Sequence, residues 1–331
     1  MKKIAFITDA WLPQVNGVVN TYINMNAVIK KDYKIKVLHP GMFKNFSYPW
    51  YKEIKLAYNT KNITEEFFTN FNPDIIHIAT EGPVGMSGKN YCKKNNLKYT
   101  TSFHTRFPEY IEKRIFLPRK ISYYLLRGFH QDSQNILVPT HSMRQVLENY
   151  NFKNVKIWSR GVNTKLFNPS KRTKNNNHQN ITYVGRVAIE KNIEAFLNLQ
   201  TNIKKIVVGD GPEINKFKYK YPEVSFVGLK KGNELAKYYA NADVLVFPSK
   251  TDTFGNVILE SLASGTPVAA FPVTGPKDIL KGSSVDTLDE NLEISVKKAL
   301  KIKRDKCREF AEQFTWGQCA QQFMSHVVEA K

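Results

Sequence analysis

The sequence has few cysteines and no long apolar run. Its only cysteines, Cys92, Cys307 and Cys319, lie too far apart along the chain for a disulfide framework or a zinc site. No window approaches the roughly 20 apolar residues that a helix needs to cross a bilayer. The first apolar run, Ile4–Ile7, ends before Asp9 and is too short for a signal peptide. These absences predict a cytoplasmic protein with reduced thiols.

Two nucleotide-binding motifs are also missing. The sequence contains neither Gly-x-Gly-x-x-Gly nor Gly-x-x-x-x-Gly-Lys, so common dinucleotide binding and P-loop ATP binding lose support. Apolar content, by contrast, is ample. Hydrophobic residues make up 42% of the chain, which is enough to offset the entropy cost of folding and excludes intrinsic disorder. A length of 331 residues predicts roughly two domains, each with its own core.

Acidic side chains are scarce relative to basic ones. The chain has 29 acidic and 49 basic residues, a net charge of +20, and base composition alone can produce part of its strong preference for lysine. Residues 1–160 carry 24 basic and 11 acidic side chains, a net charge of +13, whereas residues 161–331 carry 25 and 18, a net charge of +7. A basic surface attracts nucleic acid, anionic lipid or phosphorylated substrates, and charge alone does not choose among them.

Short β-branched runs alternate with helical patterns along almost the whole chain. Continuous apolar runs of this length are typical of parallel strands covered on both faces. The alternation predicts an α/β protein with two doubly wound, Rossmann-like domains facing a cleft. The predicted strands are Ile4–Thr8, Ile35–Leu38, Ile75–Ile78, Tyr99–Phe103 and Ile136–Pro139 in the first domain, and Ile181–Val184, Lys205–Val208, Val224–Val227, Val244–Phe247 and Pro267–Phe271 in the second.

The boundary between the two domains is predicted near Arg160. Residues 1–160 form the first domain, residues 161–312 the second, and residues 313–331 a final helical segment. An apolar stripe at roughly helical spacing runs into this segment and consists of Phe310, Phe314, Ala320, Phe323 and Val327. The stripe either closes the second domain or crosses back to pack on the first.

Two loops that follow predicted strands carry features of anion-binding sites. The loop after the first strand ends at Gly17, where a helix begins, and bare amides at a helix N-terminus bind anions. The first strand of the second domain leads into Gly185, Arg186 and Lys191. The planar donors of an arginine and the mobile charge of a lysine suit a diphosphate. A tight turn and two solvated surface cations are the structural alternatives.

The most informative segment follows the predicted strand Val244–Phe247. Asp252 and Glu260 are eight residues apart, and Gly255 stands where a helix is expected to begin. Asp252 then lies in the loop and Glu260 about one turn inside the helix. The segment offers two carboxylates for sugar hydroxyls, and the amides of Phe254–Val257 for phosphate. The structural alternative is an acidic partner of the helix dipole together with a surface residue.

These segments together resemble the retaining glycosyltransferases of family 4, which have the two-domain GT-B fold. They occur in the family's order along nearly the whole chain, and they are Pro13–Gly17, Ser102–Thr105, Ser159–Pro169, Gly185–Asn192, Gly209–Pro212, Asp252–Pro267 and Phe314–Trp316. Ser102–Thr105 and Asp252–Asn256 are most similar to members that glycosylate diacylglycerol or make sulfoquinovosyl or mannosyl lipids. The resemblance also implies that the final helix, which opens at Phe314–Trp316, returns to the first domain.

The resemblance implies a role for each matching residue. Arg186 and Lys191 would hold the donor diphosphate and stabilise the leaving nucleotide. Asp252 would contact the transferred sugar, and Glu260 would accept the ribose hydroxyls. His104 would touch the donor sugar near the reacting centre, although a packed core histidine is its structural alternative. The other donor-binding positions would be Gly17 and Gly185 near the diphosphate, Leu229 and Lys230 beside the base, and the amides of Phe254, Gly255, Asn256 and Val257.

No metal ion or other cofactor is expected besides the nucleotide sugar. The sequence lacks Asp-x-Asp, the metal-binding pattern of the other large transferase fold. Arg186, Lys191 and the helix amides can supply positive charge instead. The resemblance implies substitution on the same face of the sugar, in which the leaving phosphate helps to deprotonate the acceptor. The family pattern has Glu where this chain has the shorter Asp252, which leaves the identity of the sugar open.

Basic and apolar residues interleave around Pro118. The basic residues are Lys113, Arg114, Arg119, Lys120 and Arg127. A basic amphipathic helix after Pro118 suits an anionic membrane surface, where each cation contributes up to about 1 kcal/mol. An ordinary solvated helix with one buried side is the alternative.

We therefore predict a glycosyltransferase at the cytoplasmic face of a membrane. It would move a sugar from a UDP-linked donor to a lipid such as diacylglycerol. A GDP-mannose-dependent mannosyltransferase acting on lipid or soluble glycan is the alternative. A nucleic-acid-binding protein is a remote alternative, because the sequence lacks RNA-binding and zinc patterns and this function would leave Asp252 and Glu260 unexplained.

Overall fold

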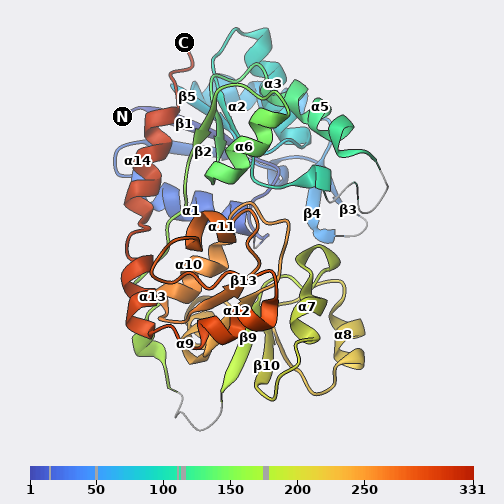
Figure 1. The fold of residues 1–331 in the computed structure, drawn as a ribbon. Coiled ribbons are helices and arrows are strands. Elements are labelled where there is room, and N and C mark those ends of the chain that lie inside the picture. Colours follow the sequence, from blue (N-terminus) through green and yellow to red (C-terminus); the bar gives the residue numbers. More distant parts are fainter. Residues whose placement is uncertain (15, 49–50, 110–111, 113–116, 174–178) are drawn as a thin grey trace. The chain divides into compact units, whose positions relative to one another are not determined.

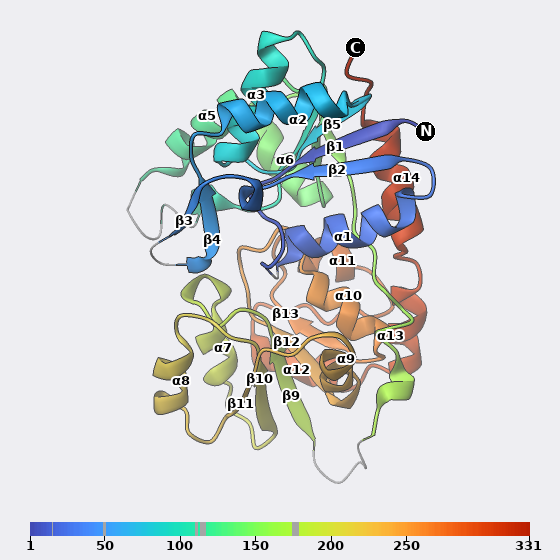
Figure 2. The ribbon, with the colours of Figure 1, turned by 180° about the vertical axis from the view of Figure 1, so that it is seen from behind.

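The computed structural model describes all residues except 15, 49–50, 110–111, 113–116 and 174–178. The chain divides into two compact units. Unit 1 consists of Met1–Arg160 together with Trp316–Lys331, and unit 2 of Gly161–Thr315. Each unit is built on one parallel sheet with helices packed on both faces (Figures 1 and 2). The predicted fold class, two doubly wound α/β domains, is confirmed.

Unit 1 contains a six-stranded parallel sheet in the order β2-β1-β5-β6-β7-β8. The strands are β1 (Lys3–Ile7), β2 (Lys34–Leu38), β5 (Ile75–Ile78), β6 (Thr100–Ser102), β7 (Ile136–Val138) and β8 (Val155–Ile157). An antiparallel pair, β3 (Asn45–Tyr48) and β4 (Tyr51–Ala57), forms a separate small sheet. The strand order reverses between β1 and β5, and open α/β sheets bind ligands beyond the carboxyl ends of strands at such a point.

The helices of unit 1 cover the two faces of its sheet. Alternate residues of β1 point to opposite faces, so that Phe6 packs with α1 and α14 while Ile7 packs with α2 and α3. No helix among the described residues is long and apolar enough to span a bilayer. The helices are α1 (Gly17–Ile29), α2 (Lys61–Phe71), α3 (Pro83–Lys94), α5 (Arg119–His130), α6 (His141–Asn149) and α14 (Trp316–His326).

Unit 2 contains a five-stranded parallel sheet in the order β11-β10-β9-β12-β13. Its strands are β9 (Asn180–Val184), β10 (Lys204–Val208), β11 (Ser225–Gly228), β12 (Val244–Phe247) and β13 (Val268–Ala270). Its helices are α7 (Ile193–Leu197), α8 (Ile214–Lys220), α9 (Gly232–Asn241), α10 (Asn256–Ala263), α11 (Pro276–Leu280), α12 (Leu292–Ala299) and α13 (Arg304–Ala311). Here the strand order reverses between β9 and β12.

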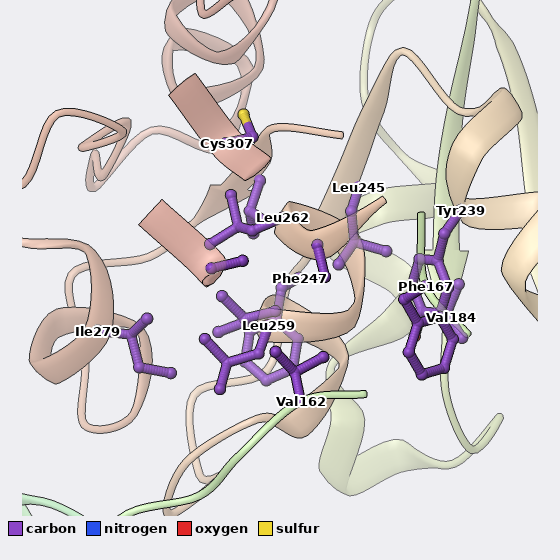
Figure 3. Packing of buried hydrophobic residues seen from close by; sticks show 14 of the residues in the cluster. Val162, Phe167, Val184, Tyr239, Leu245, Phe247, Leu259, Leu262, Ile279 and Cys307 are labelled. Carbon is purple, nitrogen blue, oxygen red and sulfur yellow. The ribbon is translucent and has the colours of Figure 1, made fainter. Parts of the chain in front are cut away.

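One core cluster of unit 2 fixes α9 and α10 against the sheet (Figure 3). Tyr239 of α9 lies beside Phe167, with ring centroids 5.6 Å apart. Leu259 and Leu262 of α10 are fully buried in the same cluster. Because this face of α10 is packed, the start of the helix has a fixed position at the carboxyl end of β12.

The apolar stripe near the C-terminal end belongs to two helices. Phe310 of α13 and Phe314 pack against the core of unit 2, with their ring centroids 5.4 Å apart. Ala320, Phe323 and Val327 pack instead into a cluster of unit 1 that includes residues of α1. The chain therefore passes between the units twice, once after Arg160 and once before Trp316.

Candidate functional site

In unit 2, the loops that follow β9 and β12 are tied together. The two strands are neighbours at the point where the strand order reverses. The side-chain amide of Asn192 donates to the carbonyl of Pro248 at 2.9 Å, and the hydroxyl of Thr251 donates to the carbonyl of Glu190 at 3.2 Å. These bonds hold the two loops in register and so position the charged residues that the loops carry.

Lys191 and Asp252 form an ion pair across these loops. Lys191 Nζ donates to Asp252 Oδ1 at 2.5 Å, and both side chains are part-exposed. Asp252 Oδ2 is buried and accepts no hydrogen bond from the residues that the structure describes. A buried acceptor without a donor costs about 1–3 kcal/mol. The oxygen is therefore one that a ligand hydroxyl can satisfy.

Glycines keep side chains away from the carboxyl ends of β9 and β10. Gly185 and Gly209 follow these strands with φ of 153° and 143°. A Cβ on Gly209 would lie 1.9 Å from the carbonyl oxygen of Gly185, so no side chain fits there. Arg186 projects from the first of these strand ends, and its carbonyl accepts a hydrogen bond from Tyr183 Oη at 2.6 Å. The backbone at the carboxyl ends of β9 and β10 is therefore uncovered by side chains at these glycines and lies beside Arg186.

Leu229 and Lys230 follow the next strand end, at Gly228. Leu229 is 55% exposed, and Lys230 Nζ forms an ion pair with Glu234 of α9 at 2.6 Å. An exposed apolar side chain with a tethered lysine at a strand end suits the edge of a planar ring. The predicted placement of these two residues beside a base stays a prediction.

Glu260 is held by Tyr239, a residue that no local sequence pattern indicates. Glu260 Oε2 accepts a hydrogen bond from Tyr239 Oη at 2.8 Å. Burial raises the pKa of the Glu260 carboxyl to about 7, an effect that the Tyr239 hydrogen bond opposes. Tyr239 lies on a different helix, 21 residues earlier, so no local sequence pattern connects the two. Each carboxylate of the predicted pair thus has its own partner.

Helix α10 begins at Asn256 with Gly255 as its N-cap, one residue later than predicted. The first N–H groups of a helix have no partner within the helix itself, and a glycine cap has no side chain to bond them. Phe254 is buried in the core, and a Cβ on Gly275 would lie 2.8 Å from its carbonyl oxygen. The backbone from Phe254 to Val257 is therefore rigidly placed, as an anion site at this helix start requires.

In unit 1, polar side chains meet beneath the carboxyl ends of β5 and β6. Tyr22 Oη lies 2.8 Å from His77 Nε2, 3.1 Å from His104 Nε2 and 3.3 Å from Ser102 Oγ. His77 Nδ1 is 2.8 Å from Thr100 Oγ1. Burial and the nearby charge of a buried arginine lower the pKa of His77 to about 3. His104, the predicted contact to a donor sugar, therefore belongs to a buried polar network.

Gly17 is the first residue of α1, as expected, but the helix start is already capped. The side-chain oxygen of Asn16 accepts hydrogen bonds from the amides of Val18 and Val19, each at 3.0 Å. The expectation of bare amides is therefore wrong at these two positions. An Asn at the N-cap commonly makes such bonds, and the Asn-Gly pair in the sequence already contained that information.

Helix α5 begins at Arg119, directly after Pro118, where the basic amphipathic helix was predicted. The predicted residues Lys113 and Arg114 lie outside the described residues. Arg119 forms an ion pair with Glu112 at 2.6 Å, which neutralises part of the predicted basic charge. Lys120 is exposed at the start of the helix.

Large apolar side chains stand exposed on the same helix. Ile121 is 47% exposed, Tyr124 66% and Leu125 63%, and their spacing places them on one face of α5. The guanidinium of Arg127 lies over the Tyr124 ring, 5.4 Å from its centroid. We call Lys120, Ile121, Tyr124, Leu125 and Arg127 the α5 face.

Comparisons with known proteins agree with this geometry. Residues 32–166 match the family model described as Glycosyltransferase Family 4, and residues 178–313 match the one described as Glycosyl transferases group 1. The chain belongs to family 4 of the glycosyltransferases and is a nucleotide-sugar glycosyltransferase. Its two units have the GT-B fold. An Anabaena protein solved in complex with UDP and glucose matches 98% of this chain and 99% of its own with a TM-score of 0.75 at 15% identity.

Curated relatives differ in donor and acceptor. A GDP-mannose-dependent alpha-mannosyltransferase of Corynebacterium glutamicum is 25% identical over 87% of this chain and 77% of its own. An alpha-monoglucosyldiacylglycerol synthase of Streptococcus pneumoniae is 26% identical over 81% of this chain and 70% of its own. A sulfoquinovosyl transferase of Arabidopsis thaliana is 29% identical over 72% of this chain and 50% of its own. One of these names specifies a GDP-mannose donor and another a diacylglycerol product. The relatives therefore do not decide the donor or the acceptor of this chain.

Proposed function

We propose that this chain is a retaining, metal-independent glycosyltransferase that transfers a sugar from a UDP-linked donor to a membrane lipid such as diacylglycerol. The observation that carries the lipid assignment is the α5 face, where three large apolar side chains and Lys120 stand exposed beside the part-exposed Arg127. The relative named alpha-monoglucosyldiacylglycerol synthase supports the acceptor, and the similar fold solved with UDP supports the donor.

Unit 2 holds the donor in this proposal. Glu260 accepts the ribose hydroxyls, and Asp252 Oδ2, which lacks a donor among the described residues, accepts a hydroxyl of the sugar. Arg186 and Lys191 bind the diphosphate together with the amides at the start of α10. Asp252 already holds the Lys191 ammonium at 2.5 Å, so the cation is positioned before the diphosphate arrives.

The transfer step follows from charge. The bond between the anomeric carbon and the phosphate oxygen breaks, and its electron pair stays on the diphosphate. The acceptor oxygen attacks the anomeric carbon from the same face, and its proton passes to the departing phosphate oxygen. Arg186, Lys191 and the helix amides stabilise the negative charge that develops on the leaving group. These cations supply what a metal ion supplies elsewhere, so we expect activity to persist in excess EDTA.

The α5 face supplies the acceptor side of the proposal. Amphipathic helices lie in the membrane interface with apolar side chains inserted and cations toward anionic headgroups. Ile121, Tyr124 and Leu125 would enter the acyl boundary while Lys120 and Arg127 contact headgroups. Unit 1 carries a net charge of +13, which adds a longer-range attraction to an anionic surface. This arrangement supports a peripheral position on a membrane, which we propose is its cytoplasmic face.

The test is a matrix of donors and acceptors with the full-length chain. UDP-glucose, UDP-galactose and GDP-mannose are each offered with diacylglycerol in anionic liposomes, in neutral liposomes, and with soluble sugars. Glycosyl-diacylglycerol made from a UDP-sugar, faster on anionic vesicles and unaffected by EDTA, supports the proposal. Glu260→Gln, which should bind the donor more weakly, serves as the control for the donor site. Equal rates on neutral and anionic vesicles would remove the electrostatic part of the membrane assignment, and complete loss in EDTA would remove the metal-free mechanism.

A GDP-mannose-dependent mannosyltransferase is the second candidate. It is favoured by the relative from Corynebacterium glutamicum, whose name specifies that donor. Transfer from GDP-mannose alone, or to a water-soluble acceptor alone, would select it while leaving the donor site in unit 2 as described. The nucleic-acid-binding alternative is not retained, because membership of family 4 accounts for Asp252 and Glu260.

A further inference from the structure

Arg160 follows β8 in unit 1, and its charged side chain is buried. Its guanidinium carbon lies 4.4 Å from the centroid of the Trp158 ring, and the side chain is 4% exposed. One nitrogen donates to the carbonyls of Trp158 and Ser159 at 2.6 and 3.2 Å. No carboxylate among the described residues forms an ion pair with it. A buried, unpaired charge is costly, which suggests that its position serves a purpose beyond packing.

The second guanidinium nitrogen of Arg160 faces His104. It lies 3.1 Å from His104 Nδ1. Guanidinium groups only donate hydrogen bonds, so Nδ1 must accept and carries no proton. The proton of the neutral ring is then on Nε2, from which it is donated to Tyr22 Oη at 3.1 Å. A protonated His104 would place an N–H against an N–H and a second positive charge beside Arg160.

The same direction of donation continues through the network. Tyr22 has accepted from His104, so its own hydroxyl proton is available to His77 Nε2 at 2.8 Å, directly or through Ser102. His77 Nε2 is then an acceptor, and its Nδ1–H donates to Thr100 Oγ1 at 2.8 Å. The donor at Arg160 thus sets the tautomer of His104, which leaves the hydroxyl proton of Tyr22 for His77 or Ser102.

We infer that Arg160 is a positioning residue that fixes His104 as a neutral imidazole with its proton on Nε2. The inference deepens the proposed function and rests on it where His104 is taken to touch the donor sugar. Both ring nitrogens of His104 are engaged, so the ring neither takes up nor releases a proton during transfer. Any contact of His104 with the sugar is therefore made without proton transfer at its ring, and the acceptor proton goes to the departing phosphate.

The electrostatic surroundings of His104 agree with this geometry. Burial and the charge of Arg160 lower the pKa of His104 well below its usual value, with smaller contributions from His77 on β5 and His130 on α5. The other ionisable groups around the network are Tyr22 of α1, whose pKa is raised by burial, Cys319 of α14 and Glu81. Glu81 Oε1 lies 3.2 Å from His130 Nε2.

The direct test observes the ring nitrogens of His104 by NMR in the full-length chain labelled with ¹⁵N-histidine. The His104 resonances are assigned by their loss in His104→Gln. In the unsubstituted chain, Nδ1 should be unprotonated and Nε2 protonated throughout pH 5.5–8. Arg160→Met removes both donor and charge, so His104 should become a mixture of tautomers and its pKa should rise toward the ordinary value, although burial still holds it down.

Three further variants separate the effects of the Arg160 charge, the Arg160 donor and the Tyr22 acceptor on His104. Arg160→Lys keeps a charged donor and should preserve the original tautomer. Arg160→Gln keeps a donor without a charge, so the tautomer should persist while the pKa of His104 rises. Tyr22→Phe removes only the acceptor of the Nε2 proton, so Nδ1 should stay unprotonated. It remains informative even if Arg160→Met does not fold.

Activity provides the second readout. Glu260 titrates in the same pH range in the unsubstituted chain and in its Arg160 variants. To cancel this effect, kcat/KM of Arg160→Met is divided by kcat/KM of the unsubstituted chain at each pH. This ratio should fall from pH 8 to pH 5.5, as part of the His104 population becomes protonated. Arg160→Lys should restore a flat ratio. A purely structural role for Arg160 would lower activity equally at every pH.

The inference is overturned if, in the unsubstituted chain, His104 carries its proton on Nδ1 or titrates between pH 5.5 and 8. It is also overturned if Arg160→Met changes neither the proton position nor the titration of His104. The NMR readout needs neither donor nor acceptor. Absence of glycosyl transfer would therefore refute the proposed function and leave the ring assignment standing. An active enzyme in which His104 titrates would refute the ring assignment and leave the proposed function standing.

Discussion

The two units place their candidate residues in opposite electrostatic conditions. In unit 1, Tyr22, His77 and His104 form a buried network in which the ring nitrogens are already engaged. In unit 2, Lys191 and Asp252 are part-exposed charges, and one carboxylate oxygen of Asp252 lacks a donor among the described residues. The first arrangement is complete in itself, whereas the second gains hydrogen bonds when a ligand arrives.

This difference indicates a division of labour. Neutral, saturated groups fix geometry and change little with pH or salt. Charged groups with unused acceptors stabilise charge that develops in a reaction. We therefore expect substitutions in unit 2 to act mainly on donor binding and leaving-group stabilisation. Substitutions in unit 1 should act on orientation and on the membrane.

The largest effect is expected at Lys191. Lys191→Met removes a cation from the leaving diphosphate and should lower kcat/KM for the donor by about 10²–10³-fold. Steady-state kinetics with the preferred nucleotide sugar measure this loss. Lys191→Arg keeps the charge and should retain much of the activity. A loss smaller than tenfold in Lys191→Met would mean that unit 2 does not carry the leaving-group charge.

Glu260→Gln should weaken nucleotide binding. The amide can still accept from a ribose hydroxyl but loses the charge, and a hydrogen bond to a charged group is worth about 1.5–3 kcal/mol, or roughly 10–100-fold in Kd. Calorimetric titration with UDP and GDP measures this change in Kd. Glu234→Gln, in an exposed ion pair with Lys230, is the control and should change Kd little. Unchanged affinity in Glu260→Gln would show that the carboxylate does not bind the donor.

The same substitution should make the chain more stable at neutral and alkaline pH. The folded-state pKa of Glu260 is raised from 4.5 to about 7, so the unfolded chain ionises first and folding stability falls as pH rises through this interval. The loss reaches about 3 kcal/mol above pH 7 and is absent below pH 4. Urea unfolding of Glu260→Gln should therefore show a gain over the unsubstituted chain that appears between pH 5 and 7. A gain independent of pH would contradict this origin.

Donor affinity should itself depend on pH through Glu260. Because the ionised carboxylate is the better acceptor for ribose hydroxyls, Kd for the nucleotide should improve up to tenfold from pH 6 to pH 8. Tyr239→Phe removes the hydrogen bond that lowers the pKa of Glu260, so the transition should move to higher pH. In Glu260→Gln the dependence should disappear. If Tyr239→Phe moves the transition to lower pH, the assignment to Glu260 is wrong.

An effect on membrane binding is expected at the α5 face of unit 1. Lys120→Glu should weaken binding to anionic liposomes by about five- to thirty-fold, because each cation near such a surface contributes roughly 1 kcal/mol and the reversal counts twice. Co-sedimentation measures the bound fraction. Lys218→Glu on the exposed side of α8, in unit 2, makes the same change in net charge and should have little effect. Equal losses in the two variants would indicate attraction by net charge rather than by α5.

The sequence predicted the two parallel sheets well but missed the elements that are short or irregular. All ten predicted strands coincide with observed strands to within one residue at each end. β8 (Val155–Ile157) was missed because the exposed Lys156 interrupts its apolar run, whereas the predicted three-residue strands β6, β7 and β13 are fully buried. The pair β3 and β4 was missed because its antiparallel pairing breaks the strand–helix alternation on which the prediction relied. Continuous apolar runs identify buried parallel strands and say little about interrupted or antiparallel ones.

For the candidate site, the sequence identified charged residues but not the groups that hold them. The loops after β9 and β12 were located because strand ends, glycines and charges coincide in the sequence there. The hydrogen bond from Tyr239 to Glu260 and the bond between Arg160 and His104 join residues 21 and 56 positions apart. Contacts at such separations leave no local pattern, so they emerge only when the sheet and its helices are assembled.

The assignment of α14 to unit 1 has a consequence for the order of folding. Phe323 of α14 packs with Phe6 and Trp158 in the core of unit 1, yet it leaves the ribosome after all of unit 2. The amide of Val162 donates to the carbonyl of Phe314 at 2.9 Å, so the two ends of unit 2 meet and the unit can close by itself. During synthesis, the unit that starts first is therefore completed last. Until then, part of its core stays uncovered.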